Sequence, residues 1–338
     1  MLHPLPGKRT LIFGCDNHSI LRASRIIKKG GLVAFPTETV YGLGADATNE
    51  KAVARIFQAK GRPQDNPLIV HISNLLQLET VARDIPSAAY TLAQYFWPGP
   101  LSLVLHKHEA IPEIVSAGLD SVAVRMPADK IALNLIKKSG VPLAAPSANL
   151  SGKPSPTLAI HVLADLTGRV DAVINHSCRI GLESTVLDLT GPIPVILRPG
   201  EVTADDLEKV LKTKVLRPDR VRKNGIPRSP GIKYRHYSPQ APLILITGRK
   251  LIRKTLIKEL EKYYQAKGYK IINLNRFIEE LGGQPQKVEQ FARLLYNALR
   301  KTDYLHCDLI LVEQIDDESL GRAVMNRLGK AATRILKV

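Results

Sequence analysis

The chain has 338 residues, a length that a single hydrophobic core seldom fills, and this favours two domains. Its 44% hydrophobic and 23% charged residues are typical of a globular protein. The sequence has no run of roughly 18 apolar residues and no signal-peptide pattern, so we expect a cytoplasmic protein that makes no contact with a membrane. The formal net charge is +17, and more than half of it lies between residues 209 and 235.

The first 200 residues are predicted to form an α/β sheet with helices. Residues 49–61 predict a helix, because Ala52, Val53, Ile56 and Phe57 share one face, while Asn49 can cap its start and Gly61 can close its end. Strands are predicted from short apolar runs that are rich in β-branched residues and bounded by Gly or Pro. These runs are 32-LVAF-35, 68-LIVHI-72, 101-LSLVL-105, 122-VAVR-125, 142-PLAAP-146, 171-DAVIN-175, 184-STVLDL-189 and 194-PVIL-197.

Residues 209–235 form a basic segment in which ten lysines and arginines stand against one acid, Asp219. Pro and Gly residues that favour turns are scattered through it. We interpret 209–240 as a linker between one domain at 1–208 and a second at 241–338. The basic side chains either belong to a solvated linker or form a strip that meets RNA or another polyanion.

After the linker, strands and helices alternate. Strands are predicted at 242–247, 270–274 and 308–312, and helices near 250–264, 287–300 and 319–336. This alternation implies a small parallel sheet with crossover helices.

The three cysteines are too far apart to suggest a disulfide framework or a zinc site. We expect Cys15, Cys178 and Cys307 to be packing residues, and we predict no metal site built from protein side chains.

The stretch 36-PTETVYGLGADA-47 carries an unusual amount of polar chemistry directly after an apolar run. Gly42, Gly44 and Ala47, with Asp65 further on, match the spacing of a dinucleotide-binding fingerprint. Six residues separate the strand from Gly42, which weakens that interpretation, because the glycines of the fingerprint open the helix directly. A Walker A loop at 151-SGKPS-155 is a weaker alternative, since a proline stands where Ser or Thr should be.

Four cations stand at predicted strand or helix ends. Arg125 and Arg198 close strands, and Lys60 and Arg62 leave the end of the helix at 49–61. Ligands gather outside the carboxyl ends of strands in open α/β sheets, so the set favours an anionic ligand such as phosphate or carboxylate. Each cation also has a structural explanation, as a surface arginine or as a partner of the helix dipole. The polar loop 146-PSANLSGKPS-155 could bind a ligand or form a simple turn.

Several further segments stand in a fixed order along the chain: 36-PTETVYGLGADA-47, 60-KGRPQDNPLIVHI-72, 97-WPGPLSLVL-105, 123-AVRMP-127, 145-APSANLSGKPSPT-157, 183-ESTVLDL-189, 197-LRPGEVT-203, 229-SPGIKYRHYSP-239 and 321-GRAVMNRLGKAA-332. Through these segments the chain resembles the threonylcarbamoyl-adenylate synthases, the YrdC-like family of the transfer-RNA threonylcarbamoyladenosine pathway. This resemblance implies an α/β protein with an N-terminal YrdC-like domain, whose sheet is twisted, open and mixed, then the linker and a small Rossmann-like α/β domain with a parallel sheet.

The resemblance also implies a reaction. L-Threonine, bicarbonate or CO2, and ATP would give threonylcarbamoyl-adenylate and pyrophosphate, with Mg²⁺ carried by the nucleotide. A transferase complex would pass the product to transfer RNA. Weak RNA binding through the basic linker is a further expectation.

Carried over by motif, the residues of the Lys-x-Arg and Ser-x-Asn signature would be catalytic and would hold the ATP phosphates and the carbamate: Lys60, Arg62, Ser147 and Asn149. Further nucleotide contacts fall at Asn66, Ser155 and Arg198, and at Tyr234 and His236 of a linker that would cover the site. Threonine contacts fall at Thr39, His71, Arg125, Ala145 and Ser184, with Arg125 the natural partner of the carboxylate. The 36–47 stretch would be a ligand-lining loop in which Gly42 and Gly44 permit close backbone approach and Tyr41 walls the pocket.

Two other function classes stay open at this point. A binding module for structured RNA would show salt-dependent RNA affinity without ATP turnover. A carbamoyl-adenylate enzyme with a different acceptor is the other, because related domains occur in hydrogenase maturation. The purpose of the C-terminal domain and the oligomeric state are not readable from the sequence.

Overall fold

The computed structural model describes residues 9–217, 237–316 and 319–338, and these form two compact units. The first unit comprises residues 9–151, 156–179 and 183–217 of the described chain. The second comprises 237–316 and 319–338 together with two short segments from earlier in the chain, 152–155 and 180–182. The part of the predicted linker at 218–236 lies outside the described residues.

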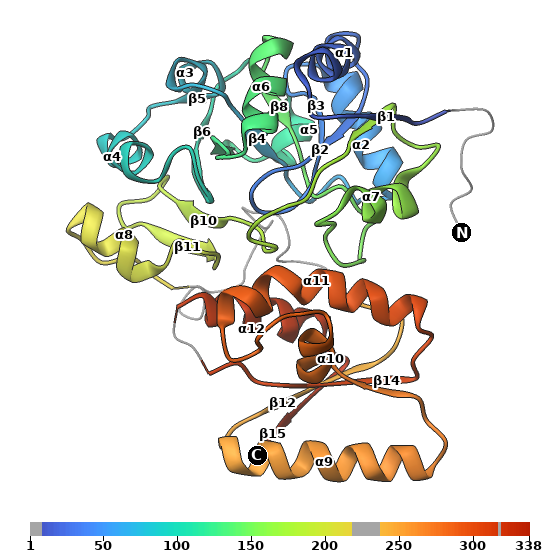
Figure 1. Cartoon of the computed structure of the whole chain (residues 1–338). Helices are drawn as coiled ribbons and strands as arrows, with labels where there is room; N and C mark the ends of the chain where they lie inside the picture. The colour runs from blue at the N-terminus through green and yellow to red at the C-terminus, as the bar shows by residue number, and fades with distance from the viewer. Residues whose placement is uncertain (1–8, 218–236, 317–318) are drawn as a thin grey trace. The chain divides into compact units, whose positions relative to one another are not determined.

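The first unit is built around a large mixed sheet (Figure 1). Its strands are β1 (Leu11–Phe13), β2 (Val33–Phe35), β3 (Gly42–Asp46), β4 (Ile69–His71), β5 (Ala82–Arg83), β6 (Leu101–Lys107), β7 (Ser121–Arg125), β8 (Leu143–Ala144), β9 (Ala172–Ile174), β10 (Thr185–Asp188) and β11 (Val195–Arg198). They follow the order β1-β9-β2-β3-β8-β4-β7-β6-β10-β11, with β5 paired to β6.

Helices surround this sheet. They are α1 (Asn17–Lys28), α2 (Glu50–Lys60), α3 (Leu78–Val81), α4 (Ser87–Phe96), α5 (Glu113–Ser116), α6 (Lys130–Ser139), α7 (Ala159–Leu166) and α8 (Ala204–Leu211), with a 3-10 turn, η1, at Leu75–Gln77. The prediction for α2 is confirmed in detail, because Asn49 caps its first turn and Gly61 closes it in the left-handed conformation with φ of 59°.

The eight strands predicted in this part of the chain are confirmed as β2, β4 and β6–β11, each within two residues of the predicted limits. Alternate side chains of these strands enter different clusters. Val70 and Val124 join the main core with α2, whereas Ile69 and Ala123 join a small apolar cluster on the other face of the sheet. Because side chains alternate along a strand, His71 and Arg125, two residues after Ile69 and Ala123, belong to the same face of the sheet as that small cluster.

Strand β3 corrects part of the interpretation of residues 36–47 as a ligand-lining loop, because residues 42–46 form a strand. Gly42 and Gly44 lie in this strand, antiparallel to β2, and the space beside them is filled by the ring of Phe35. A Cβ on Gly44 would lie 2.7 Å from Cε1 of Phe35, and one on Gly42 would lie 3.1 Å from its Cζ. The glycines therefore make room for a core phenylalanine and not for a ligand.

Tyr41 also differs from its predicted role as a pocket wall. Its side chain is fully buried in the main core, and its hydroxyl lies 2.9 Å from the carbonyl of Ile174 and accepts a hydrogen bond from the amide of His176 at 2.8 Å. Burial raises the pKa of the phenol above its usual value. Tyr41 thus fastens the end of β9 to the loop before β3.

The second unit has a four-stranded parallel sheet in the order β13-β14-β12-β15, which confirms the predicted parallel sheet. Its elements are β12 (Leu243–Thr247), α9 (Lys250–Ala266), β13 (Ile271–Asn273), α10 (Leu274–Glu280), α11 (Val288–Tyr304), β14 (Leu309–Glu313), α12 (Leu320–Ala331) and β15 (Arg334–Lys337). Ile244, Ile246 and Leu311 pack against α9, which covers one face, while α10, α11 and α12 lie on the other (Figure 1).

The predicted helix near 319–336 is too long. Helix α12 ends at Ala331, and Arg334–Lys337 instead form the edge strand β15, paired in parallel with β12. The pairing is tertiary, so a local pattern gives little sign of it. Among the cysteines, Cys178 and Cys307 are buried as expected, but Cys15 is exposed, so the packing prediction is wrong for that residue.

None of the helices in the described residues is long and apolar enough to cross a membrane.

Candidate active site

The sheet register brings four of the predicted site residues to one edge of the first unit. His71 and Arg125 are partners at the carboxyl ends of the parallel strands β4 and β7. Strand β6 runs antiparallel to β7 and begins at this edge, and β10 begins beside it just after Ser184. Strand β11 is antiparallel to β10 and ends there at Arg198. Ligands of open α/β sheets bind at edges of this kind.

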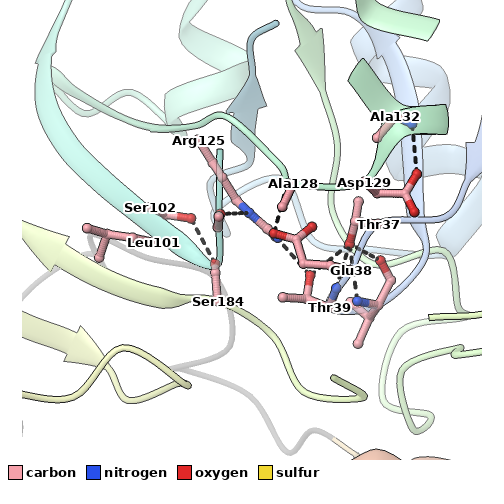
Figure 2. A network of polar contacts seen from close by, with 12 residues as sticks. Thr37, Glu38, Thr39, Leu101, Ser102, Arg125, Ala128, Asp129, Ala132 and Ser184 are labelled. Carbon is pink, nitrogen blue, oxygen red and sulfur yellow. Dashed lines mark hydrogen bonds and ion pairs between the residues drawn. The ribbon is translucent and has the colours of Figure 1, made fainter. Parts of the chain in front are cut away.

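Arg125 is held on three sides by protein groups, as Figure 2 shows. Its side chain is buried, its Nε donates to the carbonyl of Gly99 at 3.1 Å, and its Nη1 donates to Oγ1 of Thr39 at 2.9 Å. Its Nη2 lies 2.7 Å from Oε1 of Glu38. The guanidinium is therefore fixed before any ligand arrives, and its direction is set by Thr39 and Glu38.

Glu38 is a member of this cluster that the sequence interpretation did not assign. Only 4% of its side chain is exposed, and its Oε1 accepts a hydrogen bond from the amide of Ala128 at 3.0 Å while it faces Arg125. The signal in the sequence was an acid between two threonines at the exit of a buried strand. An acid in such a place needs a buried partner, because an unpaired buried carboxylate is costly.

Several buried polar atoms near this edge have no hydrogen-bond partner among the described residues. They are Nη2 of Arg125, Oε2 of Glu38 and Nδ1 of His71, and Oδ1 of Asn66 likewise lacks a hydrogen-bond partner in the turn before β4. Nη2 of Arg125 belongs to this set although Glu38 is 2.7 Å away, because its N–H does not point along that line as a hydrogen bond requires. Buried polar groups are nearly always satisfied, so this concentration calls for a ligand or for water.

His71 contributes hydrogen bonding and not charge. Burial, and then the positive charge of Arg125, lower the pKa of its imidazole to about 3. The ring stands edge-on to Phe35, with the ring centres 6.1 Å apart. A neutral imidazole with an unpartnered Nδ1 can either donate or accept, so it suits a hydroxyl group of a ligand.

Thr37 shapes the loop that carries Glu38 and Thr39. Its Oγ1 lies 2.8 Å from Oγ1 of Thr39 and accepts from the amides of Thr39 and Val40 at 3.1 and 3.2 Å (Figure 2). A threonine that bonds its own backbone in this way folds a tight turn. Thr37 therefore positions the two side chains that face Arg125, a role that the sequence interpretation did not assign to it.

Lys60 joins the two signature residues Ser147 and Asn149. Its ammonium is buried and donates to the backbone carbonyls of both residues at 2.5 Å. The hydroxyl of Ser147 donates to Oδ1 of Asn149 at 2.6 Å. The signature residues at 60 and 147–149 are thus brought together. The ammonium group of Lys60, predicted to bind a phosphate, holds the backbone of the 147–149 loop in place.

Arg62 and Asn66 form a second small group. The Arg62 guanidinium donates to the carbonyls of Asn66 and Pro67 at 3.1 and 3.0 Å, which closes the turn between α2 and β4. The side chain is only partly buried, in contrast to Lys60.

Ser184 and Arg198 form a third group. Arg198 is buried and donates to both the carbonyl and the hydroxyl of Ser184 at 3.1 Å. The hydroxyl of Ser184 also lies 2.8 Å from Oγ of Ser102, a residue the sequence interpretation did not assign. Ser102 is fully buried near the start of β6, beside Arg125 of β7 (Figure 2).

The remaining predicted site residues are placed less fully. Ala145 follows β8, and its amide donates to the carbonyl of Ile69 at 2.9 Å. Ser155 lies in the short segment that groups with the second unit. Tyr234 and His236 lie outside the described residues.

Comparisons with known proteins cover both parts of the chain. Residues 25–200 match a family described as "Telomere recombination", and residues 202–333 match the family "Threonylcarbamoyl-AMP synthase, C-terminal domain". The chain is 49% identical to the threonylcarbamoyl-AMP synthase of Pyrococcus abyssi, with 94% of this chain and 95% of the relative covered. It is 45% identical to that of Bacillus subtilis, with 94% of each covered.

Solved structures agree with these matches. The crystal structure of P. abyssi Sua5 complexed with L-threonine superimposes with a TM-score of 0.90 at 46% identity, covering 97% of this chain and 100% of that one. Escherichia coli YciO matches with a TM-score of 0.51 at 24% identity over 56% of this chain and 95% of its own, which shows the fold of the first unit alone.

Replacing His71 with leucine should flatten the dependence of stability on acid pH. The unfolded chain protonates this histidine near pH 6.5 and the folded chain only near pH 3, so between these values the unfolded state binds more protons. The free energy of unfolding of the wild type therefore falls as pH falls, with up to ~1.4 kcal/mol per pH unit coming from His71. Urea unfolding of both proteins at several pH values from about 6.5 to 4 measures the difference in slope. Parallel profiles would show that His71 is not buried as a neutral ring.

Proposed function

The chain belongs to the threonylcarbamoyl-AMP synthase family, which are nucleotidyltransferases, and we propose that it makes L-threonylcarbamoyladenylate and pyrophosphate from L-threonine, bicarbonate or CO2, and ATP. Its two family matches together span residues 25 to 333 with a single residue between them. The product would serve the N6-threonylcarbamoyladenosine modification of transfer RNAs that decode ANN codons, through a downstream transferase. A cytoplasmic location belongs to the same proposal.

The observation that carries the proposal is the fixed, buried guanidinium of Arg125. Its Nη2 is ion-paired with Glu38 but makes no aligned hydrogen bond, and it lies beside a neutral histidine whose Nδ1 has no hydrogen-bond partner among the described residues. A buried cation of this kind fits a small carboxylate, and a neutral ring fits a hydroxyl, and threonine carries both groups. The structure of the relative from P. abyssi was solved with L-threonine, which supports the same ligand class here.

The chemistry balances in two steps. The neutral amine of threonine attacks the carbon of CO2, an N–C bond forms as one C=O π bond opens, and one N–H proton passes to water, which gives a carbamate. A carbamate oxygen then attacks the α-phosphorus of ATP in line, an O–P bond forms, the bond between the α- and β-phosphates breaks, and pyrophosphate leaves with the electron pair. Such a displacement needs fixed positive groups and positioning more than a protein nucleophile.

The signature residues would supply that positioning. Because Lys60 holds the carbonyls of Ser147 and Asn149, it orders the loop whose hydroxyl and amide would meet the phosphates and the carbamate. Arg62, less buried, would reach the phosphate oxygens from the turn after α2. Asn66, Ser155 and Arg198 would add nucleotide contacts. Mg²⁺ would arrive as a companion of the nucleotide, bound by its phosphates.

Pyrophosphate release tests the proposal. Purified protein with ATP and Mg²⁺ should release pyrophosphate only when L-threonine and bicarbonate are both present, because the attacking carbamate needs both. Omitting each component in turn provides the controls. Salt-dependent RNA binding without turnover would instead identify a binding module, and turnover with carbamoyl phosphate in place of threonine and bicarbonate would identify a different acceptor.

Replacing Arg62 with alanine should lower kcat/KM for ATP by roughly ten- to a hundredfold, since a charge-assisted bond to phosphate contributes about 1.5–3 kcal/mol. The same change removes the bonds that this partly buried guanidinium donates to the carbonyls of Asn66 and Pro67, so the free energy of unfolding should also fall, by about 1.5–3 kcal/mol, while the variant stays folded under assay conditions. Steady-state kinetics and urea unfolding measure the two effects separately.

Arg55→Ala is the matched control. Arg55 lies on α2, about two turns before Arg62, and its side chain is 37% exposed. Its Nη2 lies 2.8 Å from Oδ2 of Asp171. Surface pairs contribute ~0–1 kcal/mol, so this variant should keep the wild-type kcat/KM. If Arg62→Ala lost activity only in proportion to the fraction of molecules that unfold, its role would be structural and not in phosphate binding.

A further inference from the structure

We propose that Glu38 is the anionic half of the amino-acid subsite and that its Oε2 accepts an N–H bond from the amino group of the substrate. The inference rests on the proposed function, because it takes an amino acid as the ligand. The proposal adds Glu38 to the predicted threonine contacts. Its negative charge, opposite to that of Arg125, would set the specificity for an α-amino group.

The two oxygens of Glu38 have unequal surroundings. Oε1 receives the amide of Ala128 at 3.0 Å and lies 2.7 Å from Nη2 of Arg125. Oε2 is equally buried and has no hydrogen-bond partner among the described residues. A carboxylate can accept about four hydrogen bonds, and a purely structural counter-ion would be expected to use both oxygens. One side of this carboxylate is thus satisfied by the fold, and the other is left for something that binds.

Nη2 of Arg125 and Oε2 of Glu38, which make no hydrogen bond among the described residues, are complementary to an α-amino acid. Arg125 Nη2 is a donor with positive charge, and Glu38 Oε2 is an acceptor with negative charge, on side chains that are in contact. An amino acid presents its carboxylate and its ammonium group on the same carbon atom, so a neighbouring donor and acceptor can satisfy both at once. A hydroxy acid would satisfy Arg125 but would offer Glu38 only a neutral hydroxyl.

The position of Glu38 is fixed independently of a ligand. The backbone carbonyl of Glu38 accepts a hydrogen bond from the amide of Arg179 at 3.1 Å, and Thr37 folds the turn on its other side. The side chain is therefore preorganised, which reduces the entropy lost on binding. The bond also suits the reaction, because one N–H remains on the nitrogen after the carbamate has formed, so the same oxygen can hold the nitrogen before and after that step.

Equilibrium binding to the full chain, without bicarbonate, tests the proposal with two probes. One is L-threonine, and the other is the hydroxy acid of the same configuration in which a hydroxyl replaces the amino group. Titration calorimetry should show that the wild type prefers L-threonine by roughly ten- to a hundredfold, the contribution of a charge-assisted bond. In Glu38→Gln, which keeps an acceptor for the amide of Ala128 and puts an NH2 group in place of Oε2, the preference should fall towards parity.

Asp129→Asn is the matched control. Asp129 is a nearby carboxylate whose Oδ1 caps α6 through the amides of Ile131 and Ala132 (Figure 2), and asparagine caps a helix equally well. This variant should keep the wild-type preference.

Binding of the hydroxy acid by Glu38→Gln shows that Arg125 is still in place. If Glu38→Gln does not fold, Glu38→Asp decides by the same criterion, because its carboxylate is drawn back by one methylene group. A preference below that of the wild type in the deciding variant supports the proposal. An unchanged preference, or an equal loss of affinity for both probes, overturns it. A folded wild type that binds no L-threonine would contradict the proposed function itself.

Discussion

The buried ion pair between Arg125 and Glu38 is the constraint around which this site is organised. Burying a charge away from water costs on the order of several kcal/mol per ion. A buried ion pair is therefore stable only where further hydrogen bonds offset this desolvation cost. The carbonyl of Gly99, the hydroxyl of Thr39 and the amide of Ala128 supply those bonds. They leave Nη2 of Arg125 with its ion pair but no aligned hydrogen bond, and Oε2 of Glu38 with no hydrogen bond among the described residues. A fold that desolvates a cation and an anion together, and satisfies each only in part, has the features of a binding site for a zwitterion.

The other cations of the site act differently. Lys60 is buried and donates hydrogen bonds to the carbonyls of Ser147 and Asn149, so it orders the loop that contains them. Arg198 similarly fastens Ser184 at the start of β10. Arg62 is the least buried of these groups. The positively charged side chains therefore hold loops in place, and in the proposed reaction they would also attract the triphosphate. Such fixed charges are expected where catalysis depends on positioning.

Local pattern was sufficient for much of the fold. The β-branched runs marked β4, β6 and β7, and the periodicity with Asn49 and Gly61 marked α2, because strand and helix signals of this kind depend on neighbours in the sequence. Side-chain packing across the sheet was not readable in the same way. The sequence predicts that Gly42 and Gly44 permit close approach to a ligand, whereas in the structure they contact the ring of Phe35 on the adjacent strand. Glu38 was missed for the same reason, since its partners come from residues 125 and 128.

The most direct measurement is the structure of the full chain with L-threonine and a non-hydrolysable ATP analogue bound. The threonine carboxylate should lie within hydrogen-bond distance of Arg125, its nitrogen within hydrogen-bond distance of Oε2 of Glu38, and the α-phosphate beside the loop held by Lys60. The central claim is that this buried ion pair binds the amino acid. It would be contradicted if threonine bound away from Arg125 and neither a ligand nor water contacted Arg125 and Glu38.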